Sequence, residues 1–288
     1  MGGGSRAAAH LGRFGGLVPA AVYFVLFFFI PLGLIVCFSF WHDFDYRVIH
    51  HWTLENYRYF IHQHVYLHTM WATLWMGIAA TGITLALAFP FSYWLSRYVP
   101  GGLQKPLLVL VIVPFWTSYL LRMYSWLNIL GRKGLVNTAL EKLGIIDQPL
   151  TLLFSRWSVV VVLVYLYFPF AALTLYSSID RFDWDQLLAA MDLGASPPRA
   201  IRRILVPQIR PGIITAVIFV FIPIPGEYLA PQIIGGTSVP MLGNVIDNFQ
   251  REALYARASA IALLIAAFVI VLLVLFRKSL AAKEAYGA

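Results

Sequence analysis

The chain has 288 residues, of which 60% are hydrophobic and only 12% are charged, with 21 Lys and Arg against 13 Asp and Glu. A soluble globular domain has about 45–50% apolar and about 25% charged residues, so this composition argues against a soluble domain and favours a polytopic membrane protein. The basic residues do not form a patch interleaved with stacking aromatics, which argues against nucleic-acid binding, and the single cysteine, Cys37, excludes a disulfide framework within the chain.

The N-terminal part is predicted to be a short, weakly basic tail over residues 1–14, followed by a first membrane span. Residues 15–41 carry no charged side chain. A cleaved signal peptide has an apolar core of only about 7–15 residues, which is much shorter than this run. We therefore expect a spanning helix over Leu17–Phe40 rather than a signal peptide.

Five further segments approach the length of about 20 mainly apolar residues that a spanning helix needs. In chain order they are Thr69–Leu95, Pro106–Leu130, Trp157–Ile179, Pro211–Ile234 and Ala258–Phe276. The sequence thus predicts an all-α integral membrane protein with six transmembrane helices in a single domain, 15–280, and a C-terminal tail, 281–288. More than half of the basic residues fall in the termini and in the connections on the same side as them, which predicts that both termini are cytoplasmic.

Two connections on the opposite side of the membrane are too long to be simple turns. The first, Trp41–Leu67, is rich in histidine, and His64 and His68 have the i, i+4 spacing that can share a metal on a helix. No cysteine accompanies them, so a solvated loop that meets a partner is favoured over a metal site. The second, Gly131–Arg156, contains one short predicted helix, Thr138–Leu143.

The cytoplasmic connection between the fourth and fifth spans, 183–212, is predicted to form two short helices. Gln186–Leu193 is a good helix former, and Gly194 stands where a C-terminal cap belongs. The second helix is expected to start at Pro197, to run to about Val206 and to end at Pro207.

The second of these helices has a basic face that admits two interpretations. Ser196 stands at its N-cap, and Arg199, Arg202 and Arg203 share one side at i, i+3, i+4 spacing. The arginines would bind lipid headgroups if the helix lies in the membrane interface. Alternatively, the helix docks a cytoplasmic partner, and its residue pattern alone favours neither interpretation.

The spacing of this connection closely resembles the EAA signature, E-A-A-x3-G-x9-I-x-L-P, of binding-protein-dependent ABC importer permeases. Ala189 and Ala190, then Gly194, Ile204 and Pro207 match it at the same intervals. In that family the loop is the coupling helix, which sits in a cleft of the ATPase subunit. The resemblance therefore implies that 183–212 couples this chain to a separate ATPase.

Two residues depart from the signature. Val206 replaces a leucine, which is a mild change, whereas Leu188 stands in place of the family's glutamate. Asp185 and Asp192 are candidate substitutes for the missing carboxylate, at different helical angles. The residues that the resemblance assigns to ATPase coupling are Leu188, Ala189, Ala190, Asp192, Gly194, Ser196, Arg199, Arg202, Ile204 and Pro207.

Further motifs resemble the permeases of spermidine/putrescine-type systems within the same family. They are Pro114–Arg122, Gly134–Asn137, Gly144–Asp147 and Gly226–Tyr228. The resemblance implies a type I ABC importer transmembrane domain in the bacterial inner membrane. It also implies three kinds of partner: a second permease subunit, two copies of a cytoplasmic ATPase and a periplasmic solute-binding protein.

Two ionisable residues lie within predicted spans, where such residues are candidates for function. Arg122 and Glu227 each lie 16 residues after the start of their span, about 24 Å along a helix. They are expected either to neutralise each other or to contact substrate, with Glu227 offering a carboxylate to a cation. Together with aromatic residues that offer cation–π surfaces, the predicted pathway residues are Glu227, Tyr228, Trp116, Tyr119 and Arg122.

The sequence contains no nucleotide-binding or catalytic motif that we recognise. The P-loop pattern G-x-x-x-x-G-K-[ST] does not occur, so we expect a transport subunit that is not an enzyme and binds no cofactor, with ATP and Mg on the partner ATPase. A polyamine-like cation is the expected solute. The alternatives are an importer for an amino acid, an opine-like compound or an anion, an ion-gradient-driven secondary transporter, and a membrane scaffold.

Overall fold

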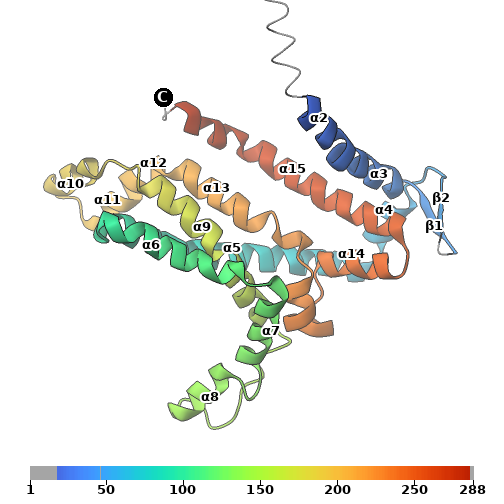
Figure 1. Cartoon of the computed structure of the whole chain (residues 1–288), viewed down its shortest axis with the longest axis horizontal. Coiled ribbons are helices and arrows are strands. Elements are labelled where there is room, and N and C mark those ends of the chain that lie inside the picture. Colours follow the sequence, from blue (N-terminus) through green and yellow to red (C-terminus); the bar gives the residue numbers. More distant parts are fainter. Residues whose placement is uncertain (1–17, 46, 286–288) are drawn as a thin grey trace, which may run out of the picture. The chain divides into compact units, whose positions relative to one another are not determined.

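The computed structural model describes residues 18–45 and 47–285, the stretch 277–285 as backbone only. The predicted N-terminal tail, 1–14, and the first residue of the first predicted span, Leu17, lie outside the described residues. The predicted C-terminal tail, 281–288, lies outside the residues with described side chains. The described chain divides into two compact units, one formed by 18–63 with 246–264 and the other by 64–245 with the rest of the last helix. Figure 1 labels their elements.

The first unit combines an apolar helical segment with a small capping structure. Its elements are α2 (Val18–Phe24), a π turn (Val25–Phe29), α3 (Ile30–Ser39), strands β1 (His42–Phe44) and β2 (Arg47–Ile49), α4 (Glu55–His62), and parts of α14 (Leu242–Arg251) and α15 (Tyr255–Ala285). The two strands form an antiparallel hairpin, which the sequence did not predict. Ser39 is the one residue of the span 18–39 that is buried.

Buried polar groups hold the capping structure of this unit together. The Asn56 side-chain amide donates to the carbonyls of Ser39 and Trp41 at 3.0 and 2.7 Å. The Asp43 carboxylate accepts the first amides of α15, from Ala256 and Arg257, at 3.0 Å each. Asp43 therefore caps α15, where a carboxylate also favours the positive end of the helix dipole.

The second unit is built on two long helices, α5 (His64–Tyr98) and α9 (Arg156–Ile179), with α13 (Arg210–Phe221) packed against both. The facing residues of α5 are small, including Gly77, Ala80 and Ala88, and this lets the helix backbones approach closely. The Ser92 hydroxyl donates to the Ala172 carbonyl of α9 at 2.9 Å, which satisfies a polar group in the apolar interior.

The described chain has four straight helices that are long and apolar enough to cross a membrane, and two bent pairs of shorter helices. The straight ones are Val18–Ser39, His64–Tyr98, Arg156–Ile179 and Tyr255–Phe276. The bent pairs are Gly101–Trp116 with Tyr119–Lys142, and Pro197–Gln208 with Arg210–Gly226. Counting each pair as one span gives the six predicted transmembrane segments.

The predicted third span is wrong as a continuous helix. The chain bends by 93° between Trp116 and Tyr119, where a 3-10 turn (Val113–Trp116) gives way to extended backbone at Thr117 and Ser118. Pro114 lies at the start of that turn and cannot continue a helical hydrogen-bond ladder. The third segment is therefore α6 (Gly101–Ile112) followed by α7 (Tyr119–Leu130), and the short helix predicted after it is α8 (Leu135–Lys142).

Candidate substrate and coupling sites

The predicted break in the fifth span is confirmed. Helix α13 ends at Phe221, a 3-10 turn covers Ile224–Gly226, and Glu227 has extended backbone. The chain then turns again through Pro231–Gly235 and Gly236–Ser238. Irregular backbone at membrane depth is tolerated where it is buried in protein or lines a wet cavity, so this segment is where a polar pathway is expected.

Glu227 stabilises the segment that follows it. Its Oε1 atom accepts the backbone amides of Leu229 and Ala230 at 3.0 and 3.3 Å, in the manner of an N-cap, and Oε2 takes no part in this cap. The side chain is half-buried. Glu227 thus has a fixed position, and the cap uses only one of its two carboxylate oxygens.

Helix α14 and α5 hold the broken segment in place. The buried Asn244 donates to the Tyr228 carbonyl at 2.8 Å and accepts the Met241 amide at 3.0 Å. The Thr73 hydroxyl accepts the Leu242 amide at 3.0 Å. Gly243 packs directly on the chain, because a Cβ atom there would lie 2.5 Å from the Glu227 carbonyl oxygen. These contacts satisfy backbone groups that the break would otherwise leave unpaired.

Arg122 lies on aromatic rings and not on a carboxylate. Its guanidinium carbon is 4.4 Å from the centre of the Phe115 ring and 5.5 Å from that of Tyr119. Its Nε and Nη1 atoms are buried and have no hydrogen-bond partner in the described structure. No ion pair with Glu227 is found among the described residues, so the predicted direct neutralisation of the two charges is not seen.

Tyr119 lies within range of both charged groups. It interacts electrostatically with both Glu227 and Arg122, and Tyr167 of α9 is also within range of Glu227. Both charged groups therefore act on the same tyrosine, and the role of all three residues in a substrate pathway stays a prediction. Trp116 and Tyr228 are exposed, at 80% and 37% of their surface, and their place in the pathway stays a prediction.

Sequence reasoning missed two aromatic residues of this group, Phe115 and Tyr167. Phe115 lies within the motif Pro114–Arg122, whose pattern alone does not show which of its aromatic rings meets Arg122. Tyr167 lies in an uninterrupted apolar stretch of the fourth span, where an aromatic residue indicates packing as readily as binding. Only the packing of α9 against the region of the break brings Tyr167 within electrostatic range of Glu227.

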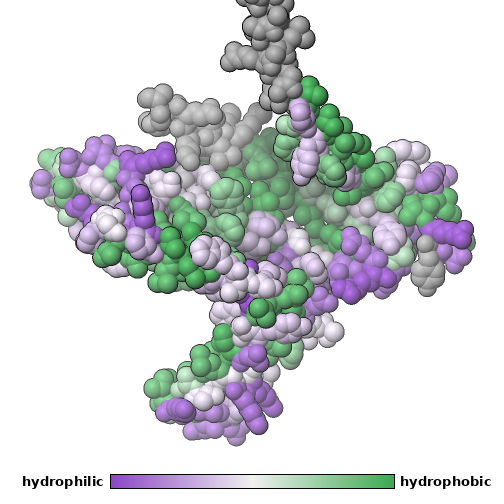
Figure 2. Space-filling view, viewed as in Figure 1, coloured by the Kyte–Doolittle hydropathy of each residue, from purple (hydrophilic) through white to green (hydrophobic). Residues whose placement is uncertain are grey.

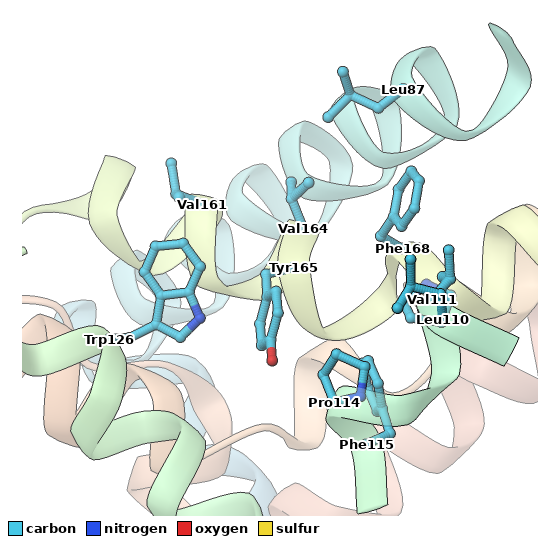
Figure 3. A pocket seen from close by; sticks show the side chains of 11 residues that line it. Leu87, Leu110, Val111, Pro114, Phe115, Trp126, Val161, Val164, Tyr165 and Phe168 are labelled. Atoms are coloured by element: carbon cyan, nitrogen blue, oxygen red, sulfur yellow. The ribbon is translucent and has the colours of Figure 1, made fainter. Parts of the chain in front are cut away.

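An apolar hollow of about 410 Å³ adjoins Arg122's aromatic neighbour Phe115. Figure 3 shows Trp126, Tyr165 and Phe115 around it, contributed by α7, α9 and the 3-10 turn. The Phe115 and Tyr165 rings stack at 6.1 Å, and Trp126 meets Tyr165 edge-on at 5.3 Å. The Phe115 ring beneath Arg122 is thus supported by aromatic packing.

The loop 183–212 forms the two predicted helices, with shifted ends. Helix α10 (Trp184–Asp192) ends in a Schellman motif, in which the Gly194 amide donates to the Met191 carbonyl at 2.9 Å and Ala195 to Ala190 at 3.0 Å. Gly194 has φ +89°, which confirms its role as the cap glycine.

The second helix of the loop does not end at Pro207, so that prediction is wrong. It runs over Pro197–Gln208 as α11 (Pro197–Ala200), a π turn (Ile201–Leu205) and α12 (Val206–Gln208). The wider π turn directly before Pro207 gives its ring room in the helix. Ser196 stands at the predicted N-cap, and its side chain makes no capping hydrogen bond.

The loop packs into a small core that it shares with the end of α9, and its outer surface is exposed. Leu187, Ala200, Leu205 and Ile209 are buried together, with Ala190 and Ile204 half-buried beside them. The other predicted coupling residues, Leu188, Ala189, Asp192, Gly194, Ser196, Arg199, Arg202 and Pro207, are exposed. Figure 2 shows hydrophilic residues gathered over α10 and α11 and hydrophobic ones over α3. An exposed surface on a loop that is anchored to the spanning helices suits docking to another protein.

The outer-loop histidines form no metal site in the described part of the chain, where no group of three or more His, Cys, Asp or Glu side chains is close enough to hold an ion. His42 instead contacts Glu55 at 3.1 Å. The Trp41 and His50 rings lie 4.2 Å apart.

A helical domain with membrane-spanning segments, one of them broken, and an exposed loop is the arrangement expected of a transport permease. Residues 84–282 match the model of the family "Binding-protein-dependent transport system inner membrane component", and the chain belongs to this family. It is therefore the permease subunit of an ATP-driven importer, an inner-membrane component.

Characterised relatives fall in the same group. The chain is 36% identical over 231 residues to the spermidine/putrescine transport system permease protein PotB of Escherichia coli strain K12, covering 80% of this chain and 83% of that protein. It is 38% identical to PotB of Haemophilus influenzae, covering 68% of each. The permease protein YdcU of Escherichia coli is 29% identical, covering 74% of this chain and 71% of that protein.

A solved structure shares the fold. The crystal structure of a bacterial alginate ABC transporter, in complex with an alginate-bound periplasmic protein, contains a chain that matches with a TM-score of 0.76 at 16% identity. The match covers 93% of each chain. It confirms the predicted type I importer fold across nearly all of this chain.

Proposed function

We propose that this permease carries a polyamine-like organic cation across the inner membrane, with Glu227 as the carboxylate that receives an amine. The observation that carries the proposal is the position of Glu227. It is fixed at a break in a spanning segment and lies within electrostatic range of Tyr119 and Tyr167. The names of the PotB relatives support the same class of solute.

A cation that leaves water needs both a counter-charge and surfaces that replace hydration. Glu227 supplies the charge, and the faces of Tyr119 and Tyr167 supply cation–π contacts of about 0.5–2 kcal/mol each. A slender, flexible polyamine presents separate amines along an apolar chain. The apolar hollow beside Phe115 suits the methylene part of such a molecule.

We propose that the loop 183–212 docks a separate ATPase, which binds ATP and Mg, while this chain binds no cofactor and catalyses no reaction. Its exposed coupling residues and its rigid Schellman turn support this. The importer would also contain a second permease subunit, two copies of the ATPase and a periplasmic solute-binding protein. The two permease subunits together would form the translocation pathway, and this chain would contribute half of it.

The experiment is solute-stimulated ATP hydrolysis by the complex in lipid, with Glu227→Gln as the key variant. Glutamine keeps an Oε1 acceptor for Leu229 and Ala230 and removes only the charge. We expect stimulation by spermidine to fall at least tenfold. Glu141→Gln, at an exposed position of α8, is the matched control and should behave as wild type. Full stimulation of Glu227→Gln by spermidine would contradict the proposal.

The buried, unpartnered nitrogens of Arg122 favour a second candidate, a solute that carries a carboxylate as well as an amine. An amino acid or opine-like compound has this pattern. Stimulation by such a compound and not by spermidine would select it. Transport that collapses with an ionophore and proceeds without ATP would instead favour a secondary transporter.

A further inference from the structure

Arg122 occupies an aromatic surface next to the proposed binding site for a cationic solute. Its guanidinium lies over Phe115 and close to Tyr119, at 4.4 and 5.5 Å from the ring centres. Tyr119 also interacts with Glu227. The same aromatic residue therefore faces a resident cation and the proposed amine-binding carboxylate.

The contacts of Arg122 satisfy its charge only in part. Its Nε and Nη1 atoms are buried and have no acceptor in the described chain. No hydrogen bond therefore compensates for the water that these atoms lose on burial. The guanidinium is not tied to Glu227 by an ion pair of the described structure. A cation held by ring faces alone can leave more easily than one held in a bidentate salt bridge.

We infer that Arg122 is a tethered competitor of the substrate: its guanidinium occupies the Phe115–Tyr119 aromatic surface in the empty site and is displaced when a solute amine binds Glu227. The inference rests on the proposed function. It makes Arg122 a specificity-determining residue that sets the affinity for cations, and not a residue that attracts an anionic solute.

This role predicts that a mutation in the binding site raises the affinity for the solute, whereas most such mutations lower it. Removing Arg122 eliminates a rival cation and a repelling charge, so the solute should bind more tightly. An arginine that binds a carboxylate, or that only supports the fold, would give weaker binding or no assembly when it is removed. The direction of the change therefore separates the roles.

The test is the spermidine concentration that gives half-maximal stimulation of ATP hydrolysis in the reconstituted complex. Arg122→Met should lower it by about 2- to 30-fold, the range expected when one competing cation–π contact is lost. Arg156→Met removes an exposed arginine of the same unit and should leave it unchanged. Arg122→Gln, which keeps a polar end, should shift it in the same direction.

An unchanged or higher half-maximal concentration in Arg122→Met would overturn the inference. Failure of both Arg122→Met and Arg122→Gln to assemble would also overturn it, because it would show a structural role. Absence of stimulation by spermidine in the wild-type complex would instead contradict the proposed function. The two claims can therefore fail separately.

Discussion

Glu227 has two separable roles. One of its oxygens caps the following helical turn, and its charge is proposed to bind the solute. Substitution by alanine removes both, whereas glutamine removes only the second. Comparing the two variants therefore measures the cap and the charge separately. Loss of an N-cap acceptor costs about 0.5–2 kcal/mol of stability, so Glu227→Ala should unfold at a lower temperature than Glu227→Gln.

Asn244 is predicted to stabilise the broken segment around Glu227. Asn244→Ala removes the acceptor of the Met241 amide and the donor to the Tyr228 carbonyl. Each buried group left unpaired costs about 1–3 kcal/mol. We expect a lower unfolding temperature by differential scanning fluorimetry in detergent and weaker stimulation by spermidine.

Asn248→Ala is the control for this prediction, because Asn248 is an exposed residue of the same helix. It should match wild type in both measurements. An Asn244→Ala protein with wild-type stability would show that the broken segment does not depend on this side chain.

We expect the shape of the coupling loop to depend on the turn at Gly194, and substitution of this glycine tests that dependence. A side chain at φ +89° is strained even though no atom lies within 4 Å of its Cβ position. Gly194→Asp should therefore lose ATPase assembly or coupled transport, measured by co-purification and solute uptake. Gly194→Asn, a residue that adopts the left-handed region more readily, should retain more activity.

Gly102→Ala is the matched control, since that glycine lies in a helix with open space around it and no positive φ. Wild-type uptake by Gly194→Asp would contradict the assignment of the loop to coupling.

Leu188 tests whether the loop docks as the family's signature implies. The side chain is 41% exposed on α10, so Leu188→Glu restores the signature carboxylate without disturbing the core. We expect coupling, measured as solute transported per ATP hydrolysed, to be unchanged or stronger. A clear loss would show that this loop meets its ATPase through an apolar contact instead.

The number of spans and the break at Glu227 followed from the sequence because both depend on local chemistry. Apolar runs of spanning length and adjacent prolines have few structural outcomes in a membrane. The 93° bend before Tyr119 was missed because Pro114 alone fits the first turn of a helix as well as its end. The hairpin β1–β2 is too short to give an alternating pattern.

The candidate site was predictable in its charges and not in its geometry. Arg122 and Glu227 were found because charge is costly within a span. Their equal depth suggested a direct pair, but the described residues show no ion pair between them, and Arg122 lies over the Phe115 ring instead. The contributions of Phe115 and Tyr167 depend on packing between helices that are distant in sequence, which no local pattern encodes.

The most direct test of the account for the whole molecule is ATP hydrolysis by the complete importer in lipid, with spermidine, an amino acid and an anion added one at a time. We expect stimulation by spermidine that is lost in Glu227→Gln and retained in Glu141→Gln. Stimulation by a different solute, or stimulation by spermidine that persists in Glu227→Gln, would contradict it.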